Sequence, residues 1–219
     1  MKIEYLGHSC FKLTESTGTT IITDPYSDEI GIQLPKGLTA DAVTISHAHY
    51  DHDNVGAIEG KPTIFRVDGF YELPGVEITG IKSYHDTEEG AKRGENVIFK
   101  FRMDGMDICH LGDLGEDCSA ELIEMLLPVN ILLIPVGGTY TLDSEQAKEY
   151  VDRIMPDIVI PMHYRSKHLT IDLDRAQGFL DEFEDEDVSV CGKNVLEFTR
   201  EDLTEEQTKI ILMERTKNK

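Results

Sequence analysis

The sequence predicts a layered α/β fold in which strands dominate the first half and helices alternate with strands in the second half. In the first half, short runs rich in β-branched and aromatic residues are separated by turn signals. In the second half, apolar runs of strand length alternate with segments in which apolar residues recur at helical spacing. Strands followed by alternating strands and helices are typical of layered α/β packing.

The first half of the chain reads as a series of short strands. Glu15–Gly18 is a turn signal between the second and third strands, and Asp104-Gly105 between the last two is a strong hairpin signal. The strands that we expect are Lys2–Leu6, Cys10–Thr14, Thr19–Thr23, Ala42–Ser46, Pro62–Val67, Val76–Ile81, Asn96–Arg102 and Met106–His110.

The second half contains the expected helices. Cys118–Leu127 has helical spacing, and Asp143 with Gln146 offers a capping box for a helix that ends near Ile154. Asp172–Glu184 has the pattern of an amphipathic helix. Between and after these helices, the expected strands are Asn130–Pro135, Asp157–Pro161, Val188–Val190 and Val195–Phe198.

The length of 219 residues is that of one domain. No repeat and no long linker rich in Pro, Gly or Ser divides the chain, so we expect a single domain over residues 1–219. The tail 201–219 is open, because Lys209–Met213 fits either a strand or a helical turn. This tail is also a candidate interface element if the chain forms a homo-oligomer.

The charge of the chain argues against two classes of partner. Its 42 acidic and 21 basic residues give a net charge of −21, which repels nucleic-acid phosphates and anionic lipid surfaces. The longest apolar stretch, Met125–Val136, is broken by two prolines and an asparagine and is too short to span a membrane. We therefore expect neither nucleic acid nor a membrane as partner.

The N-terminus and the cysteines indicate a cytoplasmic protein. No apolar segment follows a basic start at the N-terminus, so no signal peptide is expected. The cysteines form no CxxC pair and no dense framework, which favours reduced, mostly buried thiols. They are Cys10, Cys109, Cys118 and Cys191.

The chemistry of the chain is concentrated in the segment HAHYDH at 47–52. It directly follows the expected strand Ala42–Ser46, and side chains two apart on extended backbone point the same way, so His47 and His49 can bind one cation together. Asp51 and His52 follow after a turn and can face a second cation. Imidazole and carboxylate are ligands for zinc, manganese, iron or nickel. A solvated polar loop is the alternative, but three imidazoles packed together without a metal would repel one another when protonated.

The HxHxDH pattern resembles the signature of the metallo-β-lactamase superfamily, and the resemblance covers nearly the whole chain. It implies a four-layer αββα sandwich and a dinuclear site. The resemblance adds His85, Asp113 as the bridging carboxylate and His163 to the metal ligands, and it makes Asp24 the residue that orients a ligating histidine. The segments GHS at 7–9 and VGGTYT at 136–141, with the Asp24-Pro25 pair, are most similar to the compact metal-dependent hydrolase branch that includes the ascorbate-phosphate lactonases.

Each residue added by the resemblance also has an ordinary structural interpretation. Asp24 precedes proline as turn residues often do, and Asp113 would cap the helix that follows it. His85 and His163 alone would fit ordinary surface or core positions. Their positions after expected strands favour the site, where the ligands are His47, His49, Asp51, His52, His85, Asp113 and His163.

Several further residues are assigned to the surroundings of the metals. His110 is expected to support a ligand or to lie in the core, and His8 is a candidate cleft residue. Tyr140 is a candidate wall or acid of the cleft, and Gly137-Gly138 would allow a tight turn after a strand. His168 is expected to be exposed.

These assignments predict a hydrolase that uses a metal-bridging hydroxide, with Asp51 orienting the hydroxide or moving its proton. The cofactors would be two divalent ions, zinc first, with manganese, iron or nickel as alternatives. The expected substrate is a small molecule such as a lactone or other ester. A phosphodiesterase or nuclease and a non-catalytic metal-binding protein remain the alternatives.

Other branches of the superfamily fit the chain less well. The lack of a signal peptide, and of the cysteine that one common type carries at position 113, separates it from secreted β-lactamases. Flavodiiron proteins carry a glutamate at the position of His49 and a flavin domain. The chain is too short for the helical domain of hydroxyacylglutathione hydrolases, and it lacks the insertion of the RNA-cleaving members.

Overall fold

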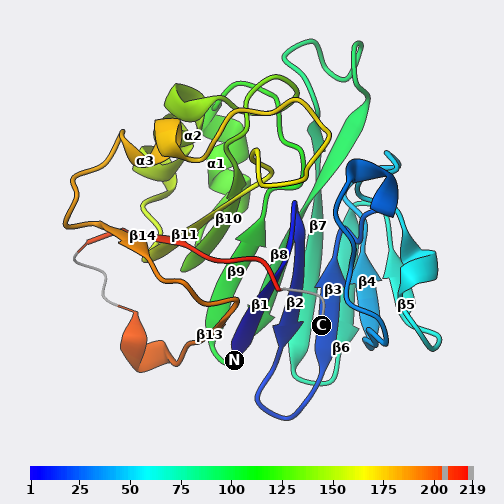
Figure 1. The fold of residues 1–219 in the computed structure, drawn as a ribbon. Helices are drawn as coiled ribbons and strands as arrows, with labels where there is room; N and C mark the ends of the chain where they lie inside the picture. The colour runs from blue at the N-terminus through cyan, green and yellow to red at the C-terminus, as the bar shows by residue number, and fades with distance from the viewer. Residues whose placement is uncertain (204–206, 217–219) are drawn as a thin grey trace.

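The computed structural model describes residues 1–203 and 207–216 and shows two β-sheets packed face to face (Figure 1). The smaller sheet has the strand order β13-β1-β2-β3-β4-β5. Its strands β1 to β3 are antiparallel, whereas β3, β4 and β5 run parallel. The bounds are β1 (Lys2–Gly7), β2 (Cys10–Thr14), β3 (Thr20–Thr23), β4 (Ala42–Thr44), β5 (Thr63–Phe65) and β13 (Val195–Glu197).

The larger sheet has the order β12-β14-β11-β10-β9-β8-β7-β6. Strands β6 to β9 form an antiparallel meander, and β9, β10, β11, β14 and β12 are parallel. The bounds are β6 (Gly69–Leu73), β7 (Val76–Tyr84), β8 (Glu95–Met103), β9 (Met106–His110), β10 (Ile131–Pro135), β11 (Ile158–Met162), β12 (Val188–Val190) and β14 (Lys209–Leu212).

Three apolar clusters hold the layers together. The central cluster joins the facing sides of the two sheets, for example Phe11 and Ile21 with Phe99 and Ile108. The outer side of the larger sheet is covered by the helices α1 (Ala120–Leu126), α2 (Ser144–Ile154) and α3 (Gln177–Leu180), which lie together on that side in Figure 1. The outer side of the smaller sheet is covered by loops and the short 3₁₀ turns η1 (Asp28–Ile30) and η2 (Val55–Ala57). The predicted α/β sandwich is confirmed, with this outermost layer built from loops.

Most predicted elements appear at the expected places. The hairpin at Asp104-Gly105 joins β8 to β9, and both halves of the capping box of Asp143 and Gln146 are formed at the start of α2. The open alternative at Lys209–Met213 is decided as a strand, since β14 pairs with β11 and β12. Positions 204–206 and 217–219 of the tail lie outside the described residues.

The predicted helix over Asp172–Glu184 is wrong for most of its length. Only α3 (Gln177–Leu180) is helical. Its first part is extended because Asp174 donates its N–H to the carbonyl of Gly137 at 2.8 Å and accepts the N–H of Arg165 at 2.7 Å. These contacts tie the segment to the loops after β10 and β11, and this tertiary pairing overrides the amphipathic pattern.

The sequence pattern also missed β6 (Gly69–Leu73). Among the described strands, it pairs with β7 alone and forms one edge of the larger sheet, and Phe70 on it is 60% exposed. Tyr71 and Leu73 are only partly buried and alternate with the exposed Phe70 and Glu72, so the strand has no fully buried residue, and the apolar Phe70 on the exposed face blurs the alternation of apolar and polar residues.

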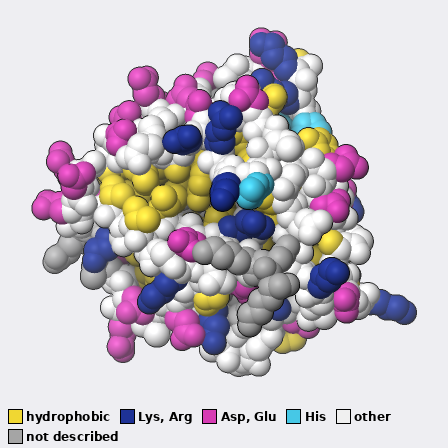
Figure 2. Space-filling view, in the orientation of Figure 1, with side chains coloured by type: hydrophobic (Ala, Val, Ile, Leu, Met, Phe, Trp, Pro, Cys, Tyr) yellow, Lys and Arg dark blue, Asp and Glu magenta, His cyan; other side chains and the backbone are white. Residues whose placement is uncertain are grey.

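The cysteines and the helices agree with what the sequence predicts for thiols and for membrane-spanning segments. All four cysteines are free; Cys10 and Cys109 are buried, and Cys118 and Cys191 are partly exposed. Among the helices of residues 1–203 and 207–216, none is both long and apolar enough to cross a membrane. On the face shown in Figure 2, acidic side chains lie mainly around the rim, and several lysines and arginines gather near the centre beside a histidine.

The pairing of the strands places one edge of both sheets at the candidate site. Strands β1, β3 and β4 share one direction in the smaller sheet, and β7, β9, β10 and β11 share one direction in the larger sheet. Strands that share a direction end at the same edge of their sheet. The loops that follow these strands carry the residues described next.

Candidate metal centre

The structure brings the seven predicted ligand residues together at this edge. One group consists of His47, His49 and His85, and the other contains Asp51, His52 and His163. Within each group, one potential ligand atom per residue lies within 4.8 Å of the others. His8, which the sequence indicated only as a candidate cleft residue, belongs to the second group of the cluster.

Asp113 lies between the two groups. Its Oδ2 is 3.2 Å from Nε2 of His85 and 3.8 Å from Nε2 of His47 in the first group. The same oxygen is 3.2 Å from Nε2 of His52 and of His163 in the second group. The other oxygen, Oδ1, is buried and has no hydrogen-bond partner among the residues that the structure describes. One carboxylate therefore touches histidines of both groups, which is the arrangement expected of a bridging ligand.

Asp24 orients two of the histidines. Its Oδ2 accepts a hydrogen bond from Nδ1 of His52 at 2.9 Å, so Nε2 of His52 points toward Asp51 and Asp113. Asp24 also accepts the N–H and the hydroxyl of Ser46, at 2.8 and 2.6 Å. The Ser46 oxygen lies 3.0 Å from Nδ1 of His47 and can accept a hydrogen bond from Nδ1–H, which leaves Nε2 of His47 as the basic nitrogen. Asp24 thus acts on both groups at once.

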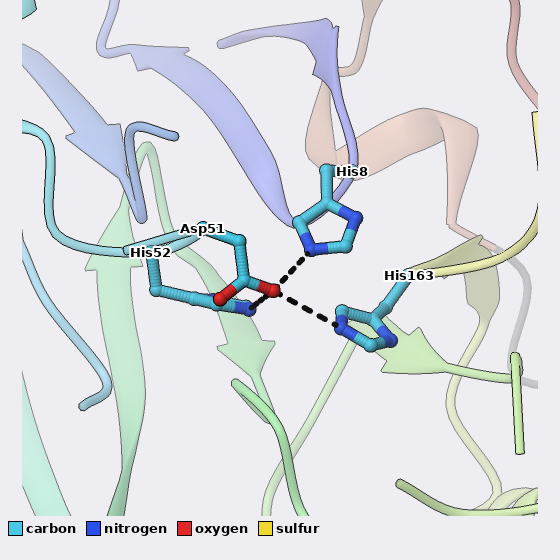
Figure 3. A group of neighbouring side chains, drawn as sticks. All are labelled: His8, Asp51, His52 and His163. Atoms are coloured by element: carbon cyan, nitrogen blue, oxygen red, sulfur yellow. Dashed lines mark hydrogen bonds and ion pairs between the residues drawn. The ribbon is translucent and has the colours of Figure 1, made fainter. Parts of the chain in front are cut away.

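His8 supports Asp51 and His163 (Figure 3). Its Nε2 lies 3.0 Å from Oδ2 of Asp51, and its carbonyl accepts the N–H of His163 at 3.1 Å. His8 sits in the connection between β1 and β2 with a φ of 55°, a left-handed conformation that few residues other than glycine adopt. The turn GHS therefore holds a histidine where it contacts two members of the second group.

The electrostatics of the cluster fit a bound cation. Burial, and after it the nearby His52, lowers the pKa of His47 to about 3, so its imidazole is neutral. Its Nε2 is buried and has no hydrogen-bond partner in the described part of the chain. Burial also lowers the pKa of His52, but Asp113, Asp24 and Asp51 raise it well above the ordinary value. The buried carboxylates of Asp24, Asp51 and Asp113 place negative charge among the imidazoles, and bound divalent ions would neutralise this charge. The donor set of imidazole and carboxylate is the one that zinc binds.

His110 is not positioned to bind a metal. Its Nε2 donates to the carbonyl of Ser9 at 2.8 Å, and its Nδ1 accepts the N–H of Gly112 at 3.2 Å. Both ring nitrogens are therefore used by the backbone, and the ring, which is 0% exposed, links the end of β9 to the turn of the smaller sheet. Of the two interpretations of His110 from the sequence, the core position fits this geometry.

Two glycines allow the loops to approach closely. Gly112 has a φ of 59°, and a Cβ there would overlap the side chain of Asn96 and lie 2.6 Å from the Cβ of Ser46. A Cβ on Gly137 would overlap the carbonyl oxygen of His163. Larger residues at these positions would push Asp113 and His163 out of place.

A cavity of about 620 Å³ opens above the cluster. The cluster forms its floor through His49, Asp51, His85, Asp113 and His163. The other residues that line it are Tyr50, Lys92, Arg93, Tyr140, Thr170, Ile171 and Asp172. Tyr140, the candidate wall residue, is in this lining and is 40% exposed, whereas His168 is exposed and lines a different cavity.

Sequence reasoning missed several residues of the site. Ser46 directly precedes the histidine motif, and that adjacency was the available signal. Asn96 on β8 accepts the N–H of Asp113 at 2.9 Å and donates to the carbonyl of Leu111, but nothing in its sequence context indicates this role. Lys92 and Arg93 come from a loop with two glycines after His85. Their adjacency in a strongly acidic chain was the only hint.

Comparison with known proteins agrees with this geometry. The sequence model of the Beta-lactamase superfamily domain matches residues 2–163. A Thermotoga maritima protein named as a Zn-dependent hydrolase of the metallo-β-lactamase superfamily is 35% identical, with a TM-score of 0.80, over 98% of this chain and 99% of that chain. A UPF0173 metal-dependent hydrolase of Thermoplasma acidophilum is 31% identical over 80% of this chain and 87% of its own. Igni18, a metallo hydrolase of Ignicoccus hospitalis, is 28% identical, with a TM-score of 0.58, over 75% of this chain and 82% of its own.

Proposed function

The chain belongs to the β-lactamase superfamily and is a metal-dependent hydrolase, and from this premise we propose that it binds two divalent ions and cleaves an ester or lactone bond of a small molecule. The observation that carries the proposal is the position of Asp113 between two groups of ligand atoms, on the floor of an open cavity. A single-ion site would need only one of these groups.

The residues divide between the two proposed ions. His47, His49 and His85 would hold one, Asp51, His52 and His163 the other, and Asp113 both. All donors are imidazole nitrogen or carboxylate oxygen, with no thiolate, which suits zinc and also manganese, iron or nickel. Zinc is the first choice, since the Thermotoga maritima relative carries zinc in its name.

Bound divalent ions supply Lewis acidity, which acidifies water and polarises a carbonyl oxygen. The chain's own residues orient the reactants. Burial raises the pKa of Asp51, but the hydrogen bonds from His52 and His8 lower it overall, so Asp51 stays ionised. An ionised Asp51 at the cavity floor can accept a hydrogen bond from the attacking water and orient it toward the substrate.

The cavity favours a small substrate. Its volume of about 620 Å³ lies within the range of about 300–1,000 Å³ that is typical of small-molecule sites. Its walls combine the rings of Tyr50 and Tyr140 with the apolar Ile171. A lactone or a short ester fits such a space, and the net charge of −21 disfavours a nucleic-acid substrate.

The test measures metal content and turnover together. The purified protein is loaded with zinc or with manganese, its metal is quantified by mass spectrometry, and it is assayed with a γ-lactone, p-nitrophenyl hexanoate and bis-p-nitrophenyl phosphate. We expect about two ions per chain and hydrolysis of the lactone or the carboxylic ester in preference to the phosphodiester. Saturation at one ion would contradict the dinuclear site, and preference for the phosphodiester would contradict the substrate class.

The variant Asp113→Asn gives the sharpest comparison. Asparagine keeps the shape of the side chain but loses its charge, so we expect loss of about one ion and of most turnover, with an unchanged circular dichroism spectrum. If Asp113 were only a helix cap, Asn would replace it nearly without cost. His168→Gln is the matched control, because His168 is exposed and lies outside the cavity lining.

A further inference from the structure

The loop of residues 86–94, called here the rim loop, follows His85 and borders the cavity. It is organised by one carboxylate: Asp86 accepts the backbone N–H groups of Glu88, Gly90, Lys92 and Arg93 at 2.8, 2.9, 2.9 and 2.7 Å. These four hydrogen bonds hold the backbone of Arg93 in a defined place beside the metal centre.

The side chain of Arg93 is held as well, but its charge is not neutralised. Its Nη2 donates to the carbonyl of Thr139 at 2.9 Å, and its guanidinium carbon lies 5.6 Å from the centre of the Tyr140 ring. Within residues 1–203 and 207–216, no carboxylate lies within ion-pair distance of Arg93. Arg93 is thus an exposed, anchored cation on the cavity wall.

Arg93 differs from Lys92, the other cationic residue that lines the cavity, in having no acidic partner among the described residues. Lys92 is also in the lining, but its Nζ is 2.5 Å from Oε1 of Glu88. Asp51 and Asp113 on the floor are engaged by histidines, and Asp172 is the remaining acidic group of the lining. A chain with twice as many acidic as basic residues could readily have supplied a partner for Arg93. A guanidinium offers a planar fork of donors that matches carboxylate and phosphate groups.

We propose that Arg93 is a specificity-determining residue that binds an anionic group, a carboxylate or a phosphate, carried by the substrate away from the bond that is cleaved. The substrate class is then an ester or lactone with a negative charge at its far end. This inference rests on the proposed function, because the same cavity must hold the scissile bond over the metal centre. The competing role for Arg93 is a strut that only ties the rim loop to Thr139.

The test uses esters that differ only at the far end. The matched substrates are p-nitrophenyl hexanoate, mono-p-nitrophenyl adipate and the p-nitrophenyl ester of 5-phosphonopentanoic acid, in which four methylene groups are followed by methyl, carboxylate or phosphonate. For the metal-loaded protein we expect a higher kcat/KM for one or both anionic esters than for the hexanoate. The two anionic arms distinguish a carboxylate from a phosphate-like group.

The variants Arg93→Gln and Arg93→Lys distinguish binding of the substrate's anionic group from a role in which Arg93 only ties the rim loop to Thr139. Arg93→Gln is expected to lower the ratio of anionic to neutral kcat/KM by about 10- to 100-fold, the size of one hydrogen bond to a charged group. Arg93→Lys should restore part of that ratio, because it keeps the charge. Arg102→Gln removes an exposed arginine that lines a different cavity and should leave the ratio unchanged. A strut alone predicts that kcat/KM falls equally for all esters, and an unchanged ratio in Arg93→Gln overturns the proposal.

A binding measurement keeps this test separate from the proposed function. Titration calorimetry on the metal-loaded protein compares adipic acid monoanilide with hexananilide, which carry an amide in place of the ester. We expect tighter binding of the acid and loss of that difference in Arg93→Gln. If no ester is hydrolysed but this difference is found, the proposed ester hydrolysis fails and the anion site stands. If the esters are hydrolysed but both anilides bind equally to the wild-type protein, the anion site fails and the hydrolase stands.

Discussion

The two ligand groups of the metal centre differ in how firmly the protein holds them. In the second group, His52 is hydrogen-bonded to Asp24, Asp51 to His8, and the backbone of His163 to His8. In the first group, His47 is supported through Ser46 and the backbone of His85 donates to the carbonyl of Gly94 at 3.1 Å, while His49 is exposed to the cavity. Partners that orient a ligand typically raise metal affinity. The second group should therefore bind its ion more tightly, and the first should hold the more exchangeable ion that faces the substrate.

The largest effect is expected when a ligand of the second group is removed. His52→Gln removes a fully buried ligand that contacts both Asp51 and Asp113, so we expect loss of about one ion per chain and of most turnover. His49→Gln should leave the ion of the second group bound and mainly weaken the binding of the ion of the first group. Zinc titration with a competing chelator measures both steps. Equal losses in the two variants would show that the groups do not differ.

Asp24→Asn comes next in size, because it weakens the hydrogen bond that orients His52. We expect a fall of about 10- to 100-fold in affinity for the tighter ion, the usual cost of removing such a partner. The matched control is Asp41→Asn, which changes an exposed carboxylate bonded to Thr20 at the opposite end of β3. An effect of Asp24→Asn confined to thermal stability, with metal affinity unchanged, would reduce Asp24 to a turn residue.

A smaller effect is expected from His8→Gln, which sharpens the role of His8. If His8 only positions Asp51, losing one hydrogen bond should lower kcat about 2- to 10-fold with both ions retained. Loss of an ion as complete as in His52→Gln would instead make His8 a ligand. His110→Gln serves as control, since both nitrogens of His110 bond the backbone and metal content should not change.

The smallest expected effect is the pH dependence of the metal-stripped protein. Burial lowers the pKa of His8 to about 4, and burial with the nearby His52 lowers that of His47 to about 3, both from an ordinary 6.5. As the pH falls below 6.5 the unfolded chain binds these protons and the folded chain does not, so stability is lost. His52 acts in the opposite sense, because carboxylates raise its pKa and its contribution is lost as the pH rises.

Burial lowers the pKa of His49 and of His110 as well, so four histidines act against His52 and the net change is a loss of stability on acidification. We expect the free energy of unfolding to fall from pH 7 to pH 5 by about 1.4 kcal/mol per pH unit for each net proton. Urea unfolding after chelation measures it, and His47→Asn should flatten the slope. A stability that rises toward pH 5 would mean that His52 dominates the cluster.

Most of the strands were predictable because they follow local rules. The hairpin at Asp104-Gly105 and the cap at Asp143 depend on residues within a few positions of one another. The helix expected at Asp172–Glu184 failed because Asp174 pairs with Gly137 and Arg165, which are remote in sequence. The edge strand β6 was missed because little of it is buried.

The sequence by itself determined the chemistry of the metal centre. The spacing of HAHYDH at 47–52 places two imidazoles on one side of extended backbone and two further ligands after a turn, and local geometry is enough to predict cation binding from that. Its resemblance to a known signature named the remaining ligand candidates, His85, Asp113 and His163, and the fold brings all three to the same sheet edge.

Only the tertiary structure decided how these ligands are supported and what surrounds them. The contact of His8 with Asp51 joins residues 43 positions apart, and the hydrogen bond of Arg93 to Thr139 joins residues 46 positions apart. Such contacts depend on the register of strands in two different sheets and on the path of the loops between them. A local pattern carries no information about these distances, because a shift of one residue in a strand would turn each side chain to the opposite face.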